Sequence, residues 1–102
     1  MNLGELIKFL EKRDQNKVVP VCFFAPHSYR GSYDCLAFAP TKHVTIGSML
    51  AYAKEALGHT YIGWKGGDYK MEEWTPIYIA NPGECGEQIG ELLMTFIVGE
   101  QP

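Results

Sequence analysis

The residue types best suited to chemistry gather in one short stretch in the first third of the chain. Seven consecutive positions hold an imidazole, a guanidinium, two hydroxyls and two phenols: His27, Ser28, Tyr29, Arg30, Ser32 and Tyr33. A guanidinium offers a planar fork of donors that matches a phosphate or carboxylate, and a tyrosine ring can stack on a base or flank a sugar. Gly31 allows a backbone to come close to a ligand. This stretch is typical of a ligand-binding loop. A solvated loop, with Arg30 paired to Asp34 and the tyrosines supporting a sheet, fits it equally well.

A second polar and aromatic stretch follows in the middle of the chain. Aromatic rings bracket a turn that holds a cation, an anion and two glycines, and the candidate ligand contacts are Trp64, Lys65, Gly66, Gly67, Asp68 and Tyr69. Backbone amides around paired glycines can form a nest for an anion. The turn is neither the phosphate loop GxxxxGK[ST] nor a GxGxxG motif, so by itself it indicates only a hairpin turn. If the two hairpins lie side by side, the two stretches predict one shared site.

Catalytic arrangements are less convincing than ligand binding. Cys35 and His27 could form a nucleophile and base, yet Cys35 falls inside an expected strand and is typical of a core residue. Glu72 and Glu73 are neighbours, and neighbours on a strand point to opposite faces. Ser28 lacks the context of a nucleophile elbow. The sequence therefore disfavours catalysis, with His27 as the best candidate for a general base.

Charge and composition exclude several classes of partner and cofactor. The chain of 102 residues has a formal net charge of −3 and no basic cluster longer than Lys12-Arg13. A DNA or RNA partner, which needs a basic face, is not expected. The three cysteines and three histidines are widely spaced and show no metal-ligand pattern, so we expect no metal and no cofactor.

The same features predict where the protein works. An odd number of cysteines outside any CxxC pair is typical of reduced thiols in a cytoplasm. The N-terminus lacks the features of a signal peptide, and no apolar run approaches the roughly 20 residues that span a bilayer. We expect a cytoplasmic protein with no membrane contact.

Three amphipathic segments predict helices. The first places Leu3, Leu6, Ile7 and Leu10 on one stripe, with Asn2 and Glu5 forming a capping box. The second starts at the cap Thr45 and stops at Gly58. The third is expected to start at Asn81-Pro82 and to stop at Gly99.

The remaining apolar segments predict strands. These are 18–24 with an irregularity at Pro20, 33–38, 59–64, a strand from Tyr69 onward, and 74–80, which Pro76 makes an edge or irregular strand. Residues 26–32 are expected to be a loop between the first two strands. The chain is thus predicted to be a single α+β domain, 1–102, with a small antiparallel sheet of about four strands and three helices in the order α-β-β-α-β-β-α.

Glycines in the last expected helix suggest a contact with another backbone. Gly86 and Gly90 leave a smooth patch beside an apolar stripe. The patch fits tight packing on the domain's own sheet, and it also fits a subunit interface. Since two-fold dimers are the commonest assembly, we expect a homo-oligomer formed through this C-terminal helix.

Four stretches carry a resemblance to a known family: KVVPV at 17–21, PHSYRGSYD at 26–34, ALGHTY at 56–61 and GWKGGDY at 63–69. They resemble a family of short uncharacterised proteins of bacteriophages and their bacterial hosts. The resemblance covers most of the chain up to Gly99, except that CFFA at 22–25 replaces a glycine-containing stretch. The family has no established catalytic residues, so none are carried over.

The resemblance implies a role in phage counter-defence. One class of such proteins, sponges, binds a nucleotide immune signal and sequesters it unchanged. By that analogy the chain is expected to bind a cyclic nucleotide or an ADP-ribose-like signal, with Arg30 and Lys65 on phosphates and Tyr29, Tyr33, Trp64 and Tyr69 on base or ribose. The alternatives are a protein-binding inhibitor of a host defence enzyme, and a small hydrolase using His27.

Overall fold

The computed structural model describes residues 1–100, which form three helices and eight short strands. The helices are α1 (Leu3–Glu11), α2 (Ile46–Ala56) and α3 (Glu91–Ile97). The strands are β1 (Val18–Val19), β2 (Cys22–Tyr29), β3 (Ser32–Thr41), β4 (Val44–Thr45), β5 (Thr60–Ile62), β6 (Asp68–Lys70), β7 (Ile77–Ile79) and β8 (Glu87–Gln88). The α+β class with three helices is confirmed.

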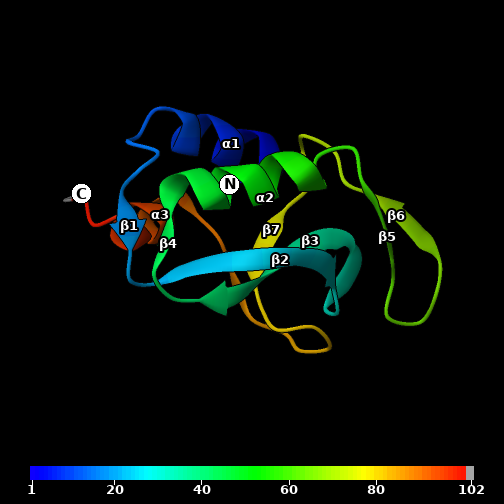
Figure 1. Cartoon of the computed structure of the whole chain (residues 1–102). Helices are drawn as coiled ribbons and strands as arrows, with labels where there is room; N and C mark the ends of the chain where they lie inside the picture. Colours follow the sequence, from blue (N-terminus) through cyan, green and yellow to red (C-terminus); the bar gives the residue numbers. More distant parts are fainter. Residues whose placement is uncertain (101–102) are drawn as a thin grey trace.

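The strands form one four-stranded sheet and two separate pairs. The main sheet has the order β2-β3-β7-β8, with β7 parallel to β3 and the other neighbours antiparallel. β1 pairs with β4, and β5 pairs with β6 in a hairpin that projects from one end of the molecule (Figure 1). The predicted single antiparallel sheet of four strands is therefore wrong, because β7 returns beside β3 in the same direction after α2 and the β5–β6 hairpin.

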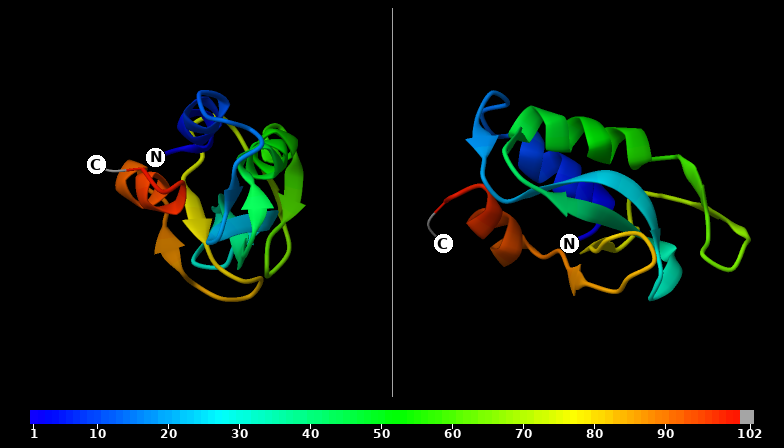
Figure 2. Two further views of the ribbon diagram at one scale, coloured as in Figure 1. Left: turned by 60° about the vertical axis from the view of Figure 1, so that its left-hand side comes forward. Right: turned by 60° about the horizontal axis from the view of Figure 1, so that its bottom comes forward.

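Helices α1 and α2 form a layer over one face of the main sheet (Figures 1 and 2). The predicted stripe of α1 is buried, and its capping box forms: Asn2 Oδ1 accepts from Glu5 N at 2.8 Å while Glu5 Oε1 accepts from Asn2 N at 2.9 Å. Thr45 caps α2 by accepting from Ser48 N at 3.0 Å. Gly58 follows α2 with φ +80°, a left-handed conformation that suits glycine at a helix end.

The first hairpin differs from its prediction in two places. Pro20 divides the expected strand, so β1 and β2 belong to different sheets, as a residue without an N–H favours. The expected loop 26–32 is wrong: β2 runs to Tyr29, and only Arg30 and Gly31 connect it to β3. A bulge at Ala25, with φ +49°, lets the strand continue past Pro26.

The expected start of the last helix at Asn81-Pro82 is also wrong, because α3 begins at Glu91. Gly86 lies so close to β7 that an added Cβ would be 1.9 Å from the Ile79 carbonyl oxygen. This contact holds the segment 81–86 against the sheet and overrides the local helix signal.

The segment 74–80 was expected to be an edge or irregular strand. The part of this segment that forms a strand, β7, instead lies inside the main sheet between β3 and β8. Pro76 precedes the strand, so no ladder N–H is lost, and its carbonyl accepts from Leu36 N at 3.1 Å.

Candidate functional site

Three loops meet at one end of the main sheet. They are the turn at Arg30-Gly31, the turn at 63–67 and the loop 81–86 that leads from β7 to β8 (Figures 1 and 2). Arg30 Nη1 donates to the Gly83 carbonyl oxygen at 2.7 Å. The Trp64 ring lies on the same residue, because a Cβ added to Gly83 would be 2.9 Å from Trp64 Cζ2. The two predicted stretches are thus brought together through a third loop.

Sequence reasoning missed Gly83. Its φ is +81°, so glycine is favoured there both by the backbone conformation and by the Trp64 ring above it. The triplet Asn81-Pro82-Gly83 is typical of a turn and could have indicated a loop here, but we expected a helix to start at Asn81-Pro82.

The two stretches also touch through their tyrosines. The rings of Tyr33 and Tyr69 are 6.2 Å apart between centroids and inclined at 54°. Both are half-buried, whereas Trp64 exposes 58% of its surface. We call the surface formed by these loops the three-loop surface; it exposes the Trp64 indole, and the half-buried phenols of Tyr33 and Tyr69 join the two hairpins beside it. Such rings are the usual stacking partners of unpaired bases.

The cations of the three-loop surface are not paired with any carboxylate of residues 1–100. Within residues 1–100, neither Arg30 nor Lys65 forms an ion pair. Asp34, the expected partner of Arg30, instead accepts a hydrogen bond from Ser32 Oγ at 2.5 Å. A guanidinium has five N–H donors, and the bond to Gly83 fixes its position while it uses only one nitrogen. Both side chains are exposed and have the chemistry to bind a phosphate.

Glycines fix the turn that carries Trp64 and Lys65. Gly66 and Gly67 have φ of +92° and +86°, and Gly63 donates to the Gly67 carbonyl oxygen at 2.9 Å. Asp68 is the first residue of β6 and is exposed. Backbone hydrogen bonds therefore close the turn and order the backbone of Trp64. Because this segment is already ordered, binding a ligand there costs less conformational entropy.

Three members of the predicted site serve the fold. Tyr29 is 7% exposed and stacks on Tyr78, with ring centroids 3.9 Å apart. Its hydroxyl donates to Gly86 O at 3.2 Å and accepts from Gly86 N at 3.1 Å. Ser28 Oγ donates to Tyr33 O at 2.7 Å, and His27 Nδ1 lies 3.0 Å from Ala25 O. These contacts shape the hairpin that presents Arg30.

Cys35 is poorly suited to act as a nucleophile. Burial, the largest cause, raises the pKa of its thiol, the Ser32 hydroxyl lowers it by hydrogen bonding, and the nearby charge of Asp34 raises it again. The thiolate is the reactive form of cysteine, and the raised pKa disfavours that form at neutral pH.

His27 lies on β2 opposite Ala37 of β3, and its Nε2 atom is buried with no hydrogen-bond partner among residues 1–100.

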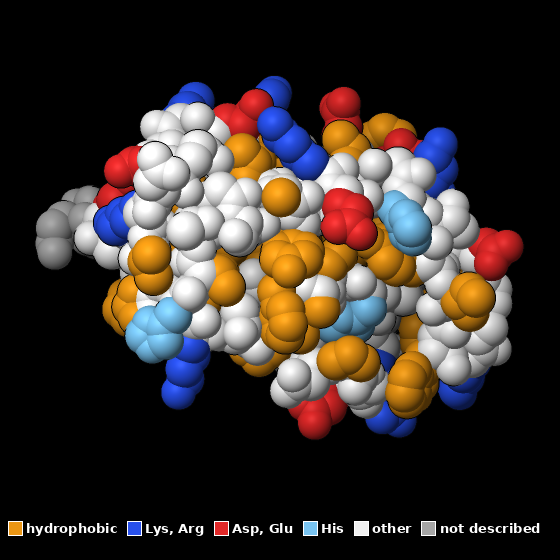
Figure 3. All heavy atoms as spheres, in the orientation of Figure 1, with side chains coloured by type: hydrophobic (Ala, Val, Ile, Leu, Met, Phe, Trp, Pro, Cys, Tyr) orange, Lys and Arg blue, Asp and Glu red, His pale blue; other side chains and the backbone are white. Residues whose placement is uncertain are grey.

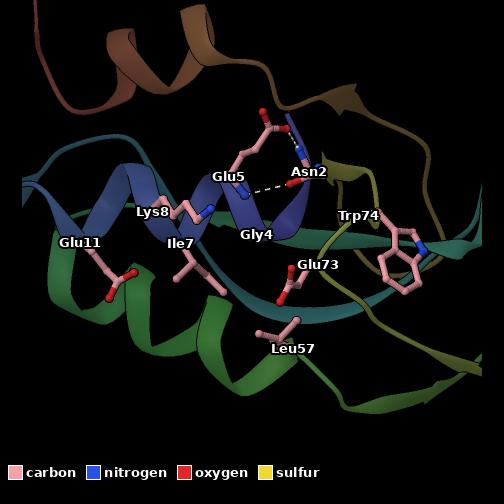
Figure 4. A pocket seen from close by; sticks show the side chains of 9 residues that line it. All are labelled: Asn2, Gly4, Glu5, Ile7, Lys8, Glu11, Leu57, Glu73 and Trp74. Carbon is pink, nitrogen blue, oxygen red and sulfur yellow. Dashed lines mark hydrogen bonds between the residues drawn. The ribbon is translucent and has the colours of Figure 1, made fainter.

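A groove of about 420 Å³ lies elsewhere, between the first turns of α1 and the segment that carries Glu73 and Trp74 (Figure 4). Glu5 turns toward Asn2 in the capping box, and Leu57 and Ile7 line the base. Its charged lining is mainly acidic, with three glutamates and one lysine: Glu5, Glu11, Glu73 and Lys8. This charge disfavours a phosphate ligand.

The three-loop surface is open. None of the four hollows described within residues 1–100 is lined by a residue of the predicted site. On the face shown in Figure 3, basic side chains are dispersed among acidic ones and form no continuous stripe. The geometry therefore fits a small anion with an aromatic ring better than a long polyanion.

The expected glycine patch on the C-terminal helix is not formed. Gly86 precedes β8 and packs against β7 of its own chain, and Gly90 is the residue before α3. A different surface of α3 is exposed, through Leu92 and Phe96.

Comparisons with known proteins identified no relative of the chain. The chain matches no family model, no curated protein and no solved structure. Within the described residues, no helix is long and apolar enough to cross a membrane. The same residues contain no group of three histidine, cysteine, aspartate or glutamate side chains placed to hold a metal ion.

Proposed function

We propose that the protein binds a small nucleotide-type ligand on the three-loop surface and sequesters it unchanged. The observation that carries the proposal is that Arg30 and Trp64, from two different hairpins, both contact Gly83. A cation and an exposed indole at one point match the two parts of a nucleotide, its phosphate and its base.

The contacts expected in the complex follow from this geometry. The free N–H groups of Arg30 bind a phosphate, and Lys65 adds a second cation. The base stacks on Trp64, with Tyr33 and Tyr69 beside the ribose. A hydrogen bond to a charged group contributes about 1.5–3 kcal/mol, and stacking on an aromatic side chain contributes about 1–3 kcal/mol per base.

The resemblance of the chain to phage and bacterial proteins suggests the ligand class, a cyclic nucleotide or ADP-ribose-like immune signal. The proposed setting is the cytoplasm of the host cell, and the proposed assembly is a homo-oligomer with one ligand surface per chain. In this role the protein acts by lowering the free concentration of the signal.

The first test is thermal unfolding of the purified protein against cyclic di- and trinucleotides, cyclic ADP-ribose isomers, NAD and ADP-ribose. Ligand at about 100 times its Kd adds roughly 2.7 kcal/mol, and each 1 kcal/mol raises the Tm of a domain this size by roughly 4–8 °C. We expect one compound to raise the Tm clearly and to be recovered intact after denaturation. Recovery of an altered compound would indicate an enzyme.

Substitutions at Arg30 locate the binding. Arg30→Gln should abolish the shift, and Arg30→Lys, which keeps the charge and loses the planar fork, should weaken it. Lys12→Gln removes one positive charge from α1's C-terminal end and serves as the matched control. A shift that survives Arg30→Gln unchanged would contradict the proposed site.

A protein-binding inhibitor is the second candidate function. On the projecting β5–β6 hairpin, Ile62 is 75% exposed and lies two residues from Trp64. Exposed apolar and indole side chains are typical anchors of protein interfaces. This function predicts no shift with any nucleotide and a host protein that co-purifies with the wild type but not with Ile62→Glu.

A further inference from the structure

Helix α3 is apolar on two sides. Met94 and Ile97 are buried in the core, while Leu92 and Phe96 are 72% and 75% exposed. Leu92 and Phe96 are four residues apart and therefore lie on the same side of the helix. Apolar side chains on a second side of a helix are typical of an element covered on that side too, and among residues 1–100 nothing covers Leu92 and Phe96.

Two hollows flank Phe96. The first, about 420 Å³, is lined by Leu92, Leu93, Thr95 and Phe96, with Glu87 and Glu100 at its rim. The second, about 200 Å³, is lined mainly by apolar residues of the β1–β2 connection and the end of α3, with Lys17 at its rim: Val19, Pro20, Val21, Phe96, Ile97, Val98 and Gly99. Phe96 is thus a ridge between a hollow with an acidic rim and a hollow with a basic residue.

We propose that this surface binds a second copy of the chain in a two-fold dimer, with Phe96 of each copy seated in the larger hollow of the other. An isologous interface requires a self-complementary surface, and a ridge beside a hollow large enough for a ring meets that requirement. This inference identifies the contact of the proposed homo-oligomer and is independent of the ligand.

Charge favours the same arrangement. A two-fold axis beside Phe96 places the larger hollow of one copy opposite Phe96 and the smaller hollow of the other, which brings Glu87 of one copy toward Lys17 of its partner. Lys17 Nζ donates to Val98 O at 2.5 Å, which leaves two of its three N–H groups for a partner. An anionic lipid surface, by contrast, would be repelled by Glu87, the glutamate of the larger hollow that is not paired with Arg13.

The exposed apolar side chains can form the centre of a dimer interface but not the whole of it. Leu92, Phe96 and Val21, the last 53% exposed, together expose apolar surface on the order of 300–400 Å², in the range of the largest patch on a typical monomer. A standard interface buries about 800 Å² per partner. The three side chains thus supply the apolar centre, and the charged rims supply the periphery.

The dimer contact and the three-loop surface lie toward opposite ends of the long axis (Figures 1 and 2). Each copy would therefore carry its own ligand surface, facing away from the dimer axis. Loss of the dimer should leave nucleotide binding by each chain unchanged.

Sedimentation equilibrium of the full chain tests the dimer. We expect a species of twice the 11.5 kDa chain mass, which Phe96→Glu converts to a monomer with an unchanged far-UV circular dichroism spectrum and a Tm lowered only by the lost association. Ile62→Glu is the matched control, since Ile62 is equally exposed on the distant hairpin, and it should remain dimeric. Leu92→Glu is a second variant on the α3 side and should also dissociate the dimer.

A charge reversal tests the two-fold arrangement. Glu87→Lys should weaken the dimer, and the double variant Glu87→Lys with Lys17→Glu should restore it. A wild type that stays monomeric at high protein concentration, or a dimer that survives both Phe96→Glu and Leu92→Glu, would overturn the proposal. Dissociation by Ile62→Glu alone would also overturn it and would place the interface on the β5–β6 hairpin. None of these results bears on the thermal shift with nucleotides, which tests the ligand surface separately.

Discussion

Gly86→Ala tests the placement of the segment before α3. An alanine Cβ at this position would lie 1.9 Å from Ile79 O and 3.0 Å from Ala80 Cβ. Ile79 belongs to β7 and pairs with Glu87 of β8, so the opposing atom is sheet backbone that cannot move aside. The segment itself must shift, and the two hydrogen bonds between Gly86 and the Tyr29 hydroxyl are then lost.

The magnitude follows from these losses. Overpacking in a well-packed region costs about 1–3 kcal/mol, and each hydrogen bond contributes about 0.5–1.5 kcal/mol. We expect Gly86→Ala to lower the free energy of unfolding by about 2–6 kcal/mol, against typical totals of about 5–15 kcal/mol. Urea unfolding followed by far-UV circular dichroism measures it, and a loss of 2 kcal/mol lowers the Tm by roughly 8–16 °C.

An increase in the free energy of unfolding on Gly86→Ala would contradict this placement of the segment. If residue 86 lay in a helix, alanine would stabilise it by about 1 kcal/mol relative to glycine. Gly90→Ser is the control. Gly90 has extended backbone angles, no neighbouring atom within 4 Å of an added Cβ and no side-chain cap for α3. Serine there should stabilise by a few tenths of a kcal/mol, because it caps the helix somewhat better than glycine does.

Three further predictions concern single side chains. Tyr29→Phe keeps the ring but leaves Gly86 N–H and C=O without their partner, so calorimetry should show a loss of about 1–3 kcal/mol, and an unchanged stability would contradict the buried pairing. Of the three thiols, Cys85 is exposed and the other two are buried, so a colorimetric thiol reagent should modify one thiol quickly and the rest only on unfolding. Hydrogen bonding by Arg13 lowers the pKa of Glu100 in the folded state. The pair therefore contributes its full stabilisation at pH values above the ordinary carboxyl pKa of about 4.3. This stabilisation is lost as the pH falls through the lower pKa of the folded state. Glu100→Gln should therefore reduce stability at neutral pH and have no effect in acid, as urea midpoints at the two pH values would show.

Local signals predicted the first two helices correctly. The cap Asn2 directly precedes the stripe of α1, and the cap Thr45 directly precedes the first residue of α2. Such signals depend on neighbours in sequence, which a single chain displays directly.

The errors arose where distant contacts decide the structure. The segment at Asn81-Pro82 carries a local helix signal, and the close approach of Gly86 to Ile79 overrides it. Tyr29 was expected to lie in a loop, either contacting a ligand or supporting the sheet, whereas it belongs to β2 and its hydroxyl bonds to a residue 57 positions away. The parallel pairing of β3 and β7 is likewise a long-range choice that no short window contains.

The candidate site shows the same division. The residue types of Arg30 and Trp64 could be recognised from the sequence, because a guanidinium and an indole beside glycines suit a ligand. Their common contact, Gly83, could not be recognised, since it joins them only after three loops have folded together.

Tryptophan fluorescence tests the ligand surface most directly. The chain has two tryptophans, so Trp74→Phe leaves Trp64 as the only reporter, and Trp64→Phe leaves only Trp74, which lines the acidic groove. Each protein is titrated with the nucleotide that gives the largest thermal shift, with calorimetry in parallel. We predict saturable quenching of Trp64 fluorescence in Trp74→Phe, with a Kd equal to the calorimetric value, and no quenching of Trp74 in Trp64→Phe. Quenching of Trp74 alone, or calorimetric binding that leaves Trp64 unchanged, would contradict it.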